Sequence, residues 1–352
     1  MSPPRQLVPA LDNSRTTPQF SLPGAKPGLI LLTTAAFGAR QFKASNRIVM
    51  EQRSVTRREA IRKAAIAGFL LSQARAAPKL GAAEITRPNE PGEAVPNLNL
   101  GVATYSLRAL PVDAAIEALK AMQITSVSVY KQHVPILVST PDVCREMAQK
   151  FRRAGITLTS TGVVQLANRE ETMRRAFECG RAAGLATMTA SYASPPDRDT
   201  LLLTERFVRE YDMRIAFHNH GPEDSVFPSP NEVWNAVQPY DERLGLCLDV
   251  GHAARAGVDP VEAIFKCRAR LYDVHFKDTL SGAGERKDRP VGLGFGHLDL
   301  RAIMSALLQI HFRYQVGLEY EVESPDPLPG IAESFGYMRG MLAALAPRRL
   351  SP

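Results

Sequence analysis

Cysteine is scarce in this sequence, and its few cysteines lie far apart. The chain has 352 residues and four cysteines, none of them in a C-x-x-C or similar metal-binding spacing. This pattern argues against a cysteine-based metal site and favours buried free thiols. One disulfide would still be compatible with an oxidising compartment. The four residues are Cys144, Cys179, Cys247 and Cys267.

Long hydrophobic runs are also absent. A membrane-spanning helix needs roughly 20 consecutive apolar residues, and no segment of the sequence approaches that length. The apolar content of 45% and the charged content of 22% are ordinary for a soluble globular protein. We therefore expect no membrane association once the leader described below has been removed.

Acidic residues are much fewer than basic residues in the N-terminal part of the chain, but not in the rest. The pI is about 9.3, but residues 1–76 alone hold 12 Lys/Arg against 3 Asp/Glu, which leaves 31 basic and 33 acidic residues in 77–352. The basic charge thus belongs to the leader. Because the remainder has a net charge of −2, electrostatics give no reason to expect a nucleic-acid partner.

The leader has the pattern of an exported protein. Met50 offers a second start and is followed by the paired arginines Arg57 and Arg58, a modestly apolar stretch over Ala64–Leu71 and the small-x-small sequence that ends at Ala76. This order resembles a twin-arginine signal peptide and predicts a periplasmic or exported protein. The alternative is a short amphipathic helix with incidental arginines. The expected organisation is 1–49 disordered or upstream of the true start, 50–76 signal peptide, 77–96 linker and 97–347 catalytic domain.

From residue 97 onward, strand and helix patterns alternate eight times. Eight such pairs over about 250 residues match a (β/α)8 TIM barrel. The rival, a doubly wound open sheet, is disfavoured because no G-x-G-x-x-G follows the first strand. The expected strands are Leu98–Tyr105, Ile124–Tyr130, Ile156–Val164, Leu185–Ser191, Arg214–His218, Leu246–Asp249, Tyr272–Phe276 and Gln315–Tyr320.

Polar side chains end the last four expected strands. His218, Asp249, His275 and Glu319 would meet at one mouth of a barrel. Two neutral imidazoles and two carboxylates can hold a divalent ion (Mn²⁺, Zn²⁺, Co²⁺, Fe²⁺ or Mg²⁺) and leave positions for a substrate. The alternative for each residue is a hydrogen-bonded strand end without a ligand.

Further candidates follow the same strands. His252 could bind a substrate oxygen or move a proton, and His220 could orient His218 or replace it as a ligand. Glu223 and Glu321 could act as a base or support the ligands.

Lys277 could hold a substrate oxyanion, or form a structural ion pair with Asp278. After the second strand, Lys131 and His133 could reach the mouth, or lie on a solvated loop. The glycine-rich segment around Gly294 matches no phosphate-binding motif and is interpreted as a flexible lid.

Four motifs carry a family resemblance that covers nearly all of 97–345. The chain resembles the sugar phosphate isomerase/epimerase group of xylose isomerase-like TIM barrels, which also includes AP endonuclease family 2. The resemblance implies metal ligands at Asp249, His275 and Glu319 and a substrate contact at His252. The motifs are HNHGPED at 218–224, DVGHAARAGVDP at 249–260, YDVHFKD at 272–278 and GLEYE at 317–321.

One residue departs from that family pattern. The ketose 3-epimerases of the group carry glutamate where this chain has His218, and two glutamates share their proton transfers. A metal site survives the change, but the two-glutamate mechanism does not carry over intact. Glu319 could still perform one half of the chemistry, with His252, Glu223 or Lys277 supplying the other.

Three function classes stay open at this point. The leading one is a metal-dependent isomerase or epimerase that removes a proton next to the carbonyl of a sugar or keto-sugar, with a lyase or hydrolase on 3-keto-glycosides as its variant. The second, an AP endonuclease-like repair enzyme, is disfavoured by charge and by the leader. The third is a non-catalytic sugar-binding barrel. The expected partner is a small-molecule sugar, and a homo-oligomer is possible.

Overall fold

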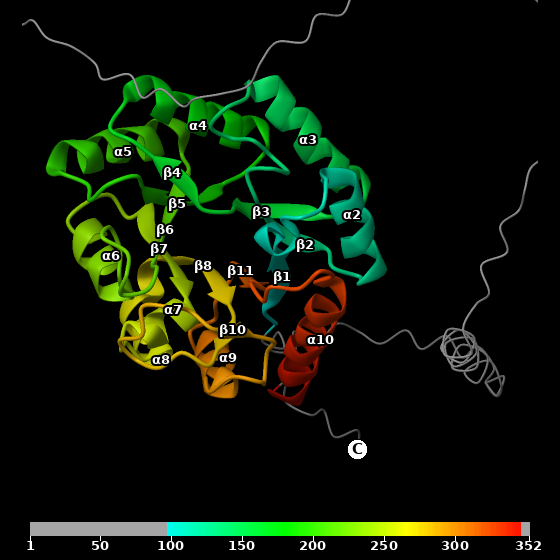
Figure 1. Cartoon of the computed structure of the whole chain (residues 1–352). Helices are drawn as coiled ribbons and strands as arrows, with labels where there is room; N and C mark the ends of the chain where they lie inside the picture. The colour runs from blue at the N-terminus through cyan, green and yellow to red at the C-terminus, as the bar shows by residue number, and fades with distance from the viewer. Residues whose placement is uncertain (1–96, 346–352) are drawn as a thin grey trace, which may run out of the picture. The chain divides into compact units, whose positions relative to one another are not determined.

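A computed structural model describes residues 97–345, and these form a nearly closed barrel of parallel strands surrounded by helices (Figure 1). The predicted TIM barrel is therefore confirmed. The leader, the linker and residues 346–347 of the predicted catalytic domain lie outside the described part. Within that part, no helix is long and apolar enough to cross a membrane.

The strands run in the order β3-β2-β1-β11-β8-β7-β6-β5-β4 around the barrel. The short strands β9 and β10 form a separate antiparallel pair. The bounds are β1 Asn99–Ala103, β2 Ser126–Val129, β3 Thr157–Thr161, β4 Val164–Leu166, β5 Thr187–Tyr192, β6 Arg214–His218, β7 Leu244–Asp249, β8 Leu271–Phe276, β9 Asp278–Thr279, β10 Pro290–Val291 and β11 Gln315–Leu318.

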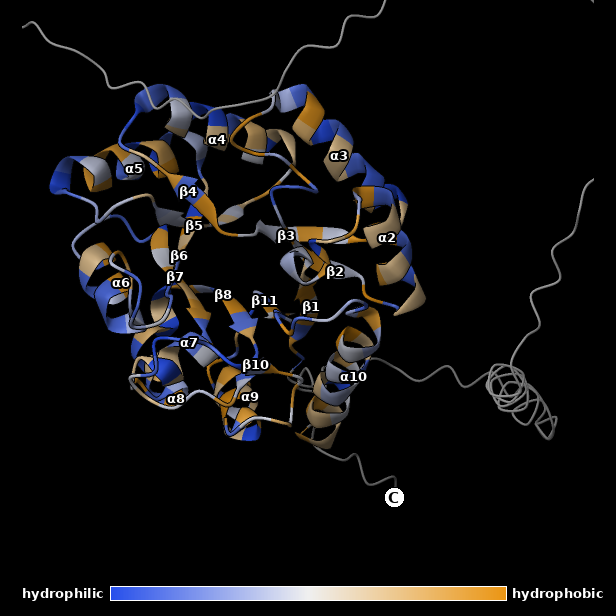
Figure 2. Ribbon diagram, in the orientation of Figure 1, coloured by the Kyte–Doolittle hydropathy of each residue, from blue (hydrophilic) through white to orange (hydrophobic). Residues whose placement is uncertain are grey.

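Helices follow the strands and form the outer layer. Their solvent-facing residues are mostly hydrophilic and their inner residues mostly apolar (Figure 2), as expected for helices that bury one face. The bounds are η1 Thr104–Leu107, α2 Val112–Ala121, α3 Pro141–Arg153, α4 Glu170–Ala182, α5 Arg198–Tyr211, α6 Pro230–Val237, α7 Val250–Arg255, α8 Pro260–Cys267, η2 Arg268–Arg270, α9 Leu300–Gln309 and α10 Leu328–Leu345.

Side-chain caps fix where several helices begin. Ser229 and Asp259 each accept a hydrogen bond from the backbone of the first turn, and each precedes a proline at the first helical position. Such a cap satisfies an N–H group that has no partner within the helix. A capping residue followed directly by proline is therefore the sequence signal for both helix starts.

The third expected strand is divided. Residues 157–161 form β3, whereas Val164, the last residue of the expected strand, begins β4, with Gly162 and Val163 between the two strands. Side chains connect β3 to β5 across this part of the barrel, because Ser160 Oγ lies 2.8 Å from Thr189 Oγ1 and Thr161 Oγ1 donates to the Thr189 carbonyl at 2.9 Å. Hydroxyl contacts therefore help to close the barrel at the division.

Candidate functional site

Four strand-end side chains converge at one end of the barrel. Parallel pairing sets Asp249 of β7 beside His275 of β8, and Glu319 follows the last residue of β11. His218 Nε2 lies 3.0 Å from His275 Nδ1 and 3.5 Å from Asp249 Oδ2, and His275 Nδ1 lies 3.2 Å from Glu319 Oε2. All four side chains are buried, and one donor atom from each lies within 4.8 Å of the others.

The donor set fits a divalent cation. Burial lowers the pKa of His218 to about 3, so its imidazole is neutral near pH 7 and can offer a lone pair. Two ring nitrogens that face each other at 3.0 Å, with two carboxylates beside them, form a nitrogen and oxygen donor set suited to transition metals. Cys247 could form a different group with the same histidines, but burial raises the pKa of its thiol to about 12.

Asp249 is positioned by three hydrogen bonds. Its backbone exchanges two of them with the Asn219 side chain, at 3.0 and 3.1 Å. Its Oδ1 accepts from the His252 N–H at 2.8 Å and so caps α7. The other carboxylate oxygen, Oδ2, remains directed at His218 and Lys277.

Lys277 supplies a positive charge beside the four donors. Its Nζ lies 3.0 Å from Asp249 Oδ2, 3.0 Å from Glu319 Oε2 and 2.5 Å from Glu321 Oε2. Burial acts to lower the pKa of Lys277, but these carboxylates outweigh it and hold the pKa well above its usual value. As formal charges, three carboxylates and one ammonium sum to −2. Burial acts to lower the pKa of His275 too, but the groups around it hold that pKa well above its usual value, so this imidazole adds positive charge while no ion is bound.

Gly251 makes room for this lysine. A Cβ atom at position 251 would lie 2.7 Å from Lys277 Cγ and 2.8 Å from Cδ, closer than carbon atoms pack. The glycine in the DVGH motif therefore lets the aliphatic part of Lys277 pass against α7.

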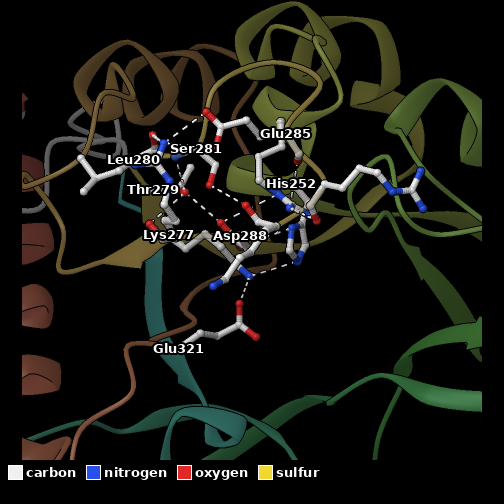
Figure 3. A network of polar contacts seen from close by, with 12 residues as sticks. His252, Lys277, Thr279, Leu280, Ser281, Glu285, Asp288 and Glu321 are labelled. Carbon is white, nitrogen blue, oxygen red and sulfur yellow. Dashed lines mark hydrogen bonds and ion pairs between the residues drawn. The ribbon is translucent and has the colours of Figure 1, made fainter.

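His252 connects Lys277 to the loop between β9 and β10. His252 Nε2 lies 3.3 Å from Lys277 Nζ, and Nδ1 lies 3.6 Å from Asp288 Oδ2 (Figure 3). Burial lowers the pKa of His252, which favours the neutral ring. His252, Asp288 and Glu321 also form a second group with metal-binding spacing.

Arg255 holds that loop in place. Its side chain is completely buried and donates to the carbonyls of Glu285 and Arg286 at 3.2 and 3.0 Å. It also forms an ion pair with Glu223 at 2.5 Å. One buried arginine thus ties the loop between β9 and β10 to α7. The segment predicted as a lid follows β10, and the backbone N–H groups of Gly294 and Gly296 donate to Asp278 Oδ2 at 3.0 and 2.9 Å.

A cavity of about 330 Å³ opens above the cluster. Six residues predicted from sequence line it, whereas Asp249, His275 and Lys277 are buried close by without lining it. The six are Lys131, His218, His220, His252, Glu319 and Glu321.

Two predicted residues are placed elsewhere. His133 is buried, with Nδ1 2.9 Å from Thr104 Oγ1 and Nε2 3.1 Å from the Leu110 carbonyl, so both ring nitrogens have partners. Glu223 pairs with Arg255. Neither residue lines the cavity.

Sequence reasoning missed several residues that line or border the cavity. Tyr105 and Tyr130 each follow a strand closely, so the strand-end rule applied to β6, β7, β8 and β11 would have found them. Gln165 lies within β4 and Asp288 on the loop after β9. No local sequence signal marked either of those.

A family model described as "Xylose isomerase-like TIM barrel" matches residues 116–341. The chain belongs to this family. The match spans the strands and loops that build the cluster of His218, Asp249, His275 and Glu319.

Similarity to individual curated proteins is low. The rhizopine catabolism protein MocC of Rhizobium meliloti is 29% identical over 164 residues, which cover 42% of this chain and 49% of MocC. A probable endonuclease 4 of Mycobacterium ulcerans is 31% identical over 84 residues, 23% of this chain and 32% of that protein. The chain thus spans at most about half the length of these curated relatives.

Among solved structures, the 3-keto-D-glucoside 4-epimerase YcjR of E. coli superposes with a TM-score of 0.55. It is 13% identical, and the match covers 69% of this chain and 100% of YcjR. At that identity the likeness shows a shared fold.

Proposed function

We propose that this xylose isomerase-like barrel is a divalent-metal-dependent isomerase or epimerase acting on a sugar or keto-sugar. The observation that carries the proposal is the group of four buried donor atoms within 4.8 Å of one another beside a polar cavity. His218, Asp249, His275 and Glu319 would hold the ion. A bound divalent ion would polarise a substrate carbonyl or hydroxyl and stabilise negative charge that develops on it.

The residues around the cavity suit proton transfer next to a carbonyl. Burial lowers the pKa of His252, its ring lines the cavity, and the carboxylate of Asp288 lies 3.6 Å from its Nδ1. We assign His252 the role of the general base that removes a proton from carbon, because a carboxylate beside an imidazole can orient the ring for proton transfer. Glu319 would carry out the second proton transfer of the reaction. Lys277, which keeps its proton, would stabilise a substrate oxyanion. Glu223 is a weaker candidate because Arg255 holds it.

A lyase or hydrolase acting on 3-keto-glycosides is the second candidate. Removal of the same α-proton, followed by loss of the β-substituent, would give an unsaturated ketone, and the structural likeness to a 3-keto-D-glucoside 4-epimerase favours such substrates. Incubation of metal-loaded protein with 3-keto-glycosides in D2O distinguishes an isomerase or epimerase from a lyase. Deuterium in an epimerised or isomerised sugar supports the isomerase class, and an unsaturated product supports the lyase, whereas deuterium in recovered substrate reports only the proton removal that both share.

Metal content is the first test. Elemental analysis should find about one divalent ion per chain in the parent, and loss of that ion in His218→Ala and Glu319→Ala. His297→Ala and Glu333→Ala are matched controls, because both side chains are exposed and outside the cluster. A metal-free parent under metal-replete conditions would reject the proposal.

The other classes have their own tests. Cleavage of an abasic DNA duplex would support the endonuclease-like alternative, which the partial match to endonuclease 4 raises and the charge of residues 77–352 opposes. Sugar binding that survives metal removal, without turnover of any sugar, would support a non-catalytic binding barrel.

A further inference from the structure

A second cavity adjoins the polar one and has a different lining. Its volume is about 250 Å³, and it shares Lys131, Val163 and Gln165 with the polar cavity. Apart from Lys131 and Gln165, its lining is apolar and contains no aromatic ring: Val129, Val134, Pro135, Ile136, Leu137, Val138, Val163 and Val164. We call this space the apolar chamber.

The apolar chamber lies on the same side of the barrel as the metal cluster. Its walls are the segment after β2 and the strand β4, and loops after the strands form the active-site face of TIM barrels. Lys131 stands at the junction, with its ammonium 5.8 Å from the centre of the Tyr130 ring, which lines the polar cavity. A ligand could therefore occupy both spaces at once.

The wall of the chamber is held in a fixed conformation. His133 ties the segment after β2 to Thr104 and to the Leu110 carbonyl. Farther along, Cys144 Sγ lies 3.8 Å from the Pro135 carbonyl and Cys179 Sγ 3.4 Å from the Ser139 carbonyl. Ligand sites are usually preformed in this way, and it gives His133 a structural role.

Two apolar side chains on this wall are open to solvent. Val138 is 82% exposed, and Leu137 is only partly buried. Exposed apolar side chains around a concave space gain free energy when a ligand covers them. A second sugar ring would find few hydrogen-bonding partners among these residues, so an apolar group fits the lining better.

We infer that the apolar chamber binds an aglycone, an apolar substituent of ring size carried by the sugar in the polar cavity. An apolar cavity of about 150 Å³ accommodates benzene, so 250 Å³ holds a substituted aromatic ring. The inference rests on the proposed function for the sugar half of the ligand. It narrows the substrate class from free sugars to glycosides with an apolar aglycone.

The test compares three probes on the full-length, metal-loaded protein by calorimetry. These are methyl β-D-glucopyranoside, 4-nitrophenyl β-D-glucopyranoside and 4-nitrophenol. We expect the aryl glucoside to bind at least about tenfold more tightly than the methyl glucoside, and 4-nitrophenol to bind by itself in the millimolar range. Equal affinities of the two glucosides, or no binding of any probe, would overturn the inference.

Substitutions in the wall test whether the preference for the aryl glucoside arises in the apolar chamber. Leu137→Asp and Val138→Asp should each remove the aryl preference and weaken binding of 4-nitrophenol. Val138→Asp guards against misfolding, because its side chain is already in solvent. Leu202→Asp is the matched control, since Leu202 is 39% exposed on α5, outside both cavities. An aryl preference that survives both wall substitutions would also overturn the inference.

The two proposals fail separately. Binding of 4-nitrophenol that depends on Leu137, in a protein that turns over no sugar, would leave the chamber in place and reject the proposed function. Turnover of keto-sugars without an aryl preference would support the proposed function and reject the apolar chamber as a binding site for an aglycone.

Discussion

His218 is the residue at which this chain departs most clearly from the epimerase pattern, and its burial has a measurable consequence. The unfolded chain protonates this histidine near pH 6.5, whereas the folded protein keeps it neutral down to about pH 3. Between these values the unfolded state binds more protons, so stability falls as the pH is lowered.

We predict that the free energy of unfolding of metal-free protein decreases from pH 6.5 toward pH 4, by at most about 1.4 kcal/mol per pH unit from this one group. Urea titrations at several pH values, in the presence of a chelator, measure the slope. His218→Asn should flatten it, whereas His297→Asn, at an exposed position, should not. The same slope in parent and His218→Asn would contradict the assignment.

Lys277 is the common positive partner of three carboxylates. Lys277→Met leaves Asp249, Glu319 and Glu321 without their common cation, and loss of one partner of a buried ion pair costs about 3–5 kcal/mol. We expect the metal-free variant to melt well below the parent, and added Mn²⁺ to raise its Tm by more than it raises that of the parent.

Thermal denaturation with and without Mn²⁺ measures both effects. Lys120→Met removes a surface ion pair with Glu117 and should change Tm little, as expected for exposed pairs. A Lys277→Met variant as stable as the parent without metal would show that the buried contacts contribute nothing.

At the scale of one element, α7 depends on a residue that also belongs to the cluster. Asp249 caps this helix through Oδ1 and faces the other donors through Oδ2. Asparagine caps helices about as well as aspartate, whereas alanine in their place costs about 1 kcal/mol. We predict loss of metal in both Asp249→Asn and Asp249→Ala. The alanine variant should be less stable than the asparagine variant by about 1 kcal/mol. Elemental analysis and urea unfolding of metal-free protein measure the two effects, and equal stabilities would argue against the cap.

Most elements could be predicted because their local signals agree with the fold. The strands Arg214–His218 and Leu271–Phe276 are short apolar runs, buried throughout or nearly so, and Ser229 and Asp259 mark helix starts. The short helix α7 was missed because Val250–Arg255 has too few residues to show a helical period. The β9–β10 pair was also missed, because it consists of two-residue strands.

The site was predictable to the extent that its residues end strands. His218, Asp249, His275 and Glu319 were found in this way, and the structure brings them together. His133 shows the limit of the rule, because sequence cannot tell a side chain that faces the cavity from one that stabilises the loop behind it. Arg255 was missed for a related reason: a charged residue in a helix gives no sign that it is buried.

At the scale of the whole molecule, Arg255 couples the barrel to the loop beside the site. Arg255→Ala leaves Glu223 and the carbonyls of Glu285 and Arg286 without their partner. We predict a loss of about 3–5 kcal/mol in stability and faster limited proteolysis within 282–289. The control Arg209→Ala, on the surface of α5, should be cleaved within 282–289 at the same rate as the parent. Unchanged cleavage in Arg255→Ala would show that the loop is held by other contacts.

Export also concerns the whole molecule, and it stays a proposal from sequence because residues 1–96 lie outside the described part. Replacement of Arg57 and Arg58 by lysine should retain a fusion of the full chain in the cytoplasm of a bacterial host. Cell fractionation measures this, and unchanged export would exclude the twin-arginine route.

The ammonium of Lys277 bears on the order in which the protein matures. Buried carboxylates close to one another repel, and in some metalloproteins the chain folds only when the ion binds. Here the chain brings its own cation to Asp249, Glu319 and Glu321. Under the proposed function, this ammonium offsets part of the carboxylate repulsion before an ion binds, so we expect the metal-free barrel to fold and to take up the ion afterwards.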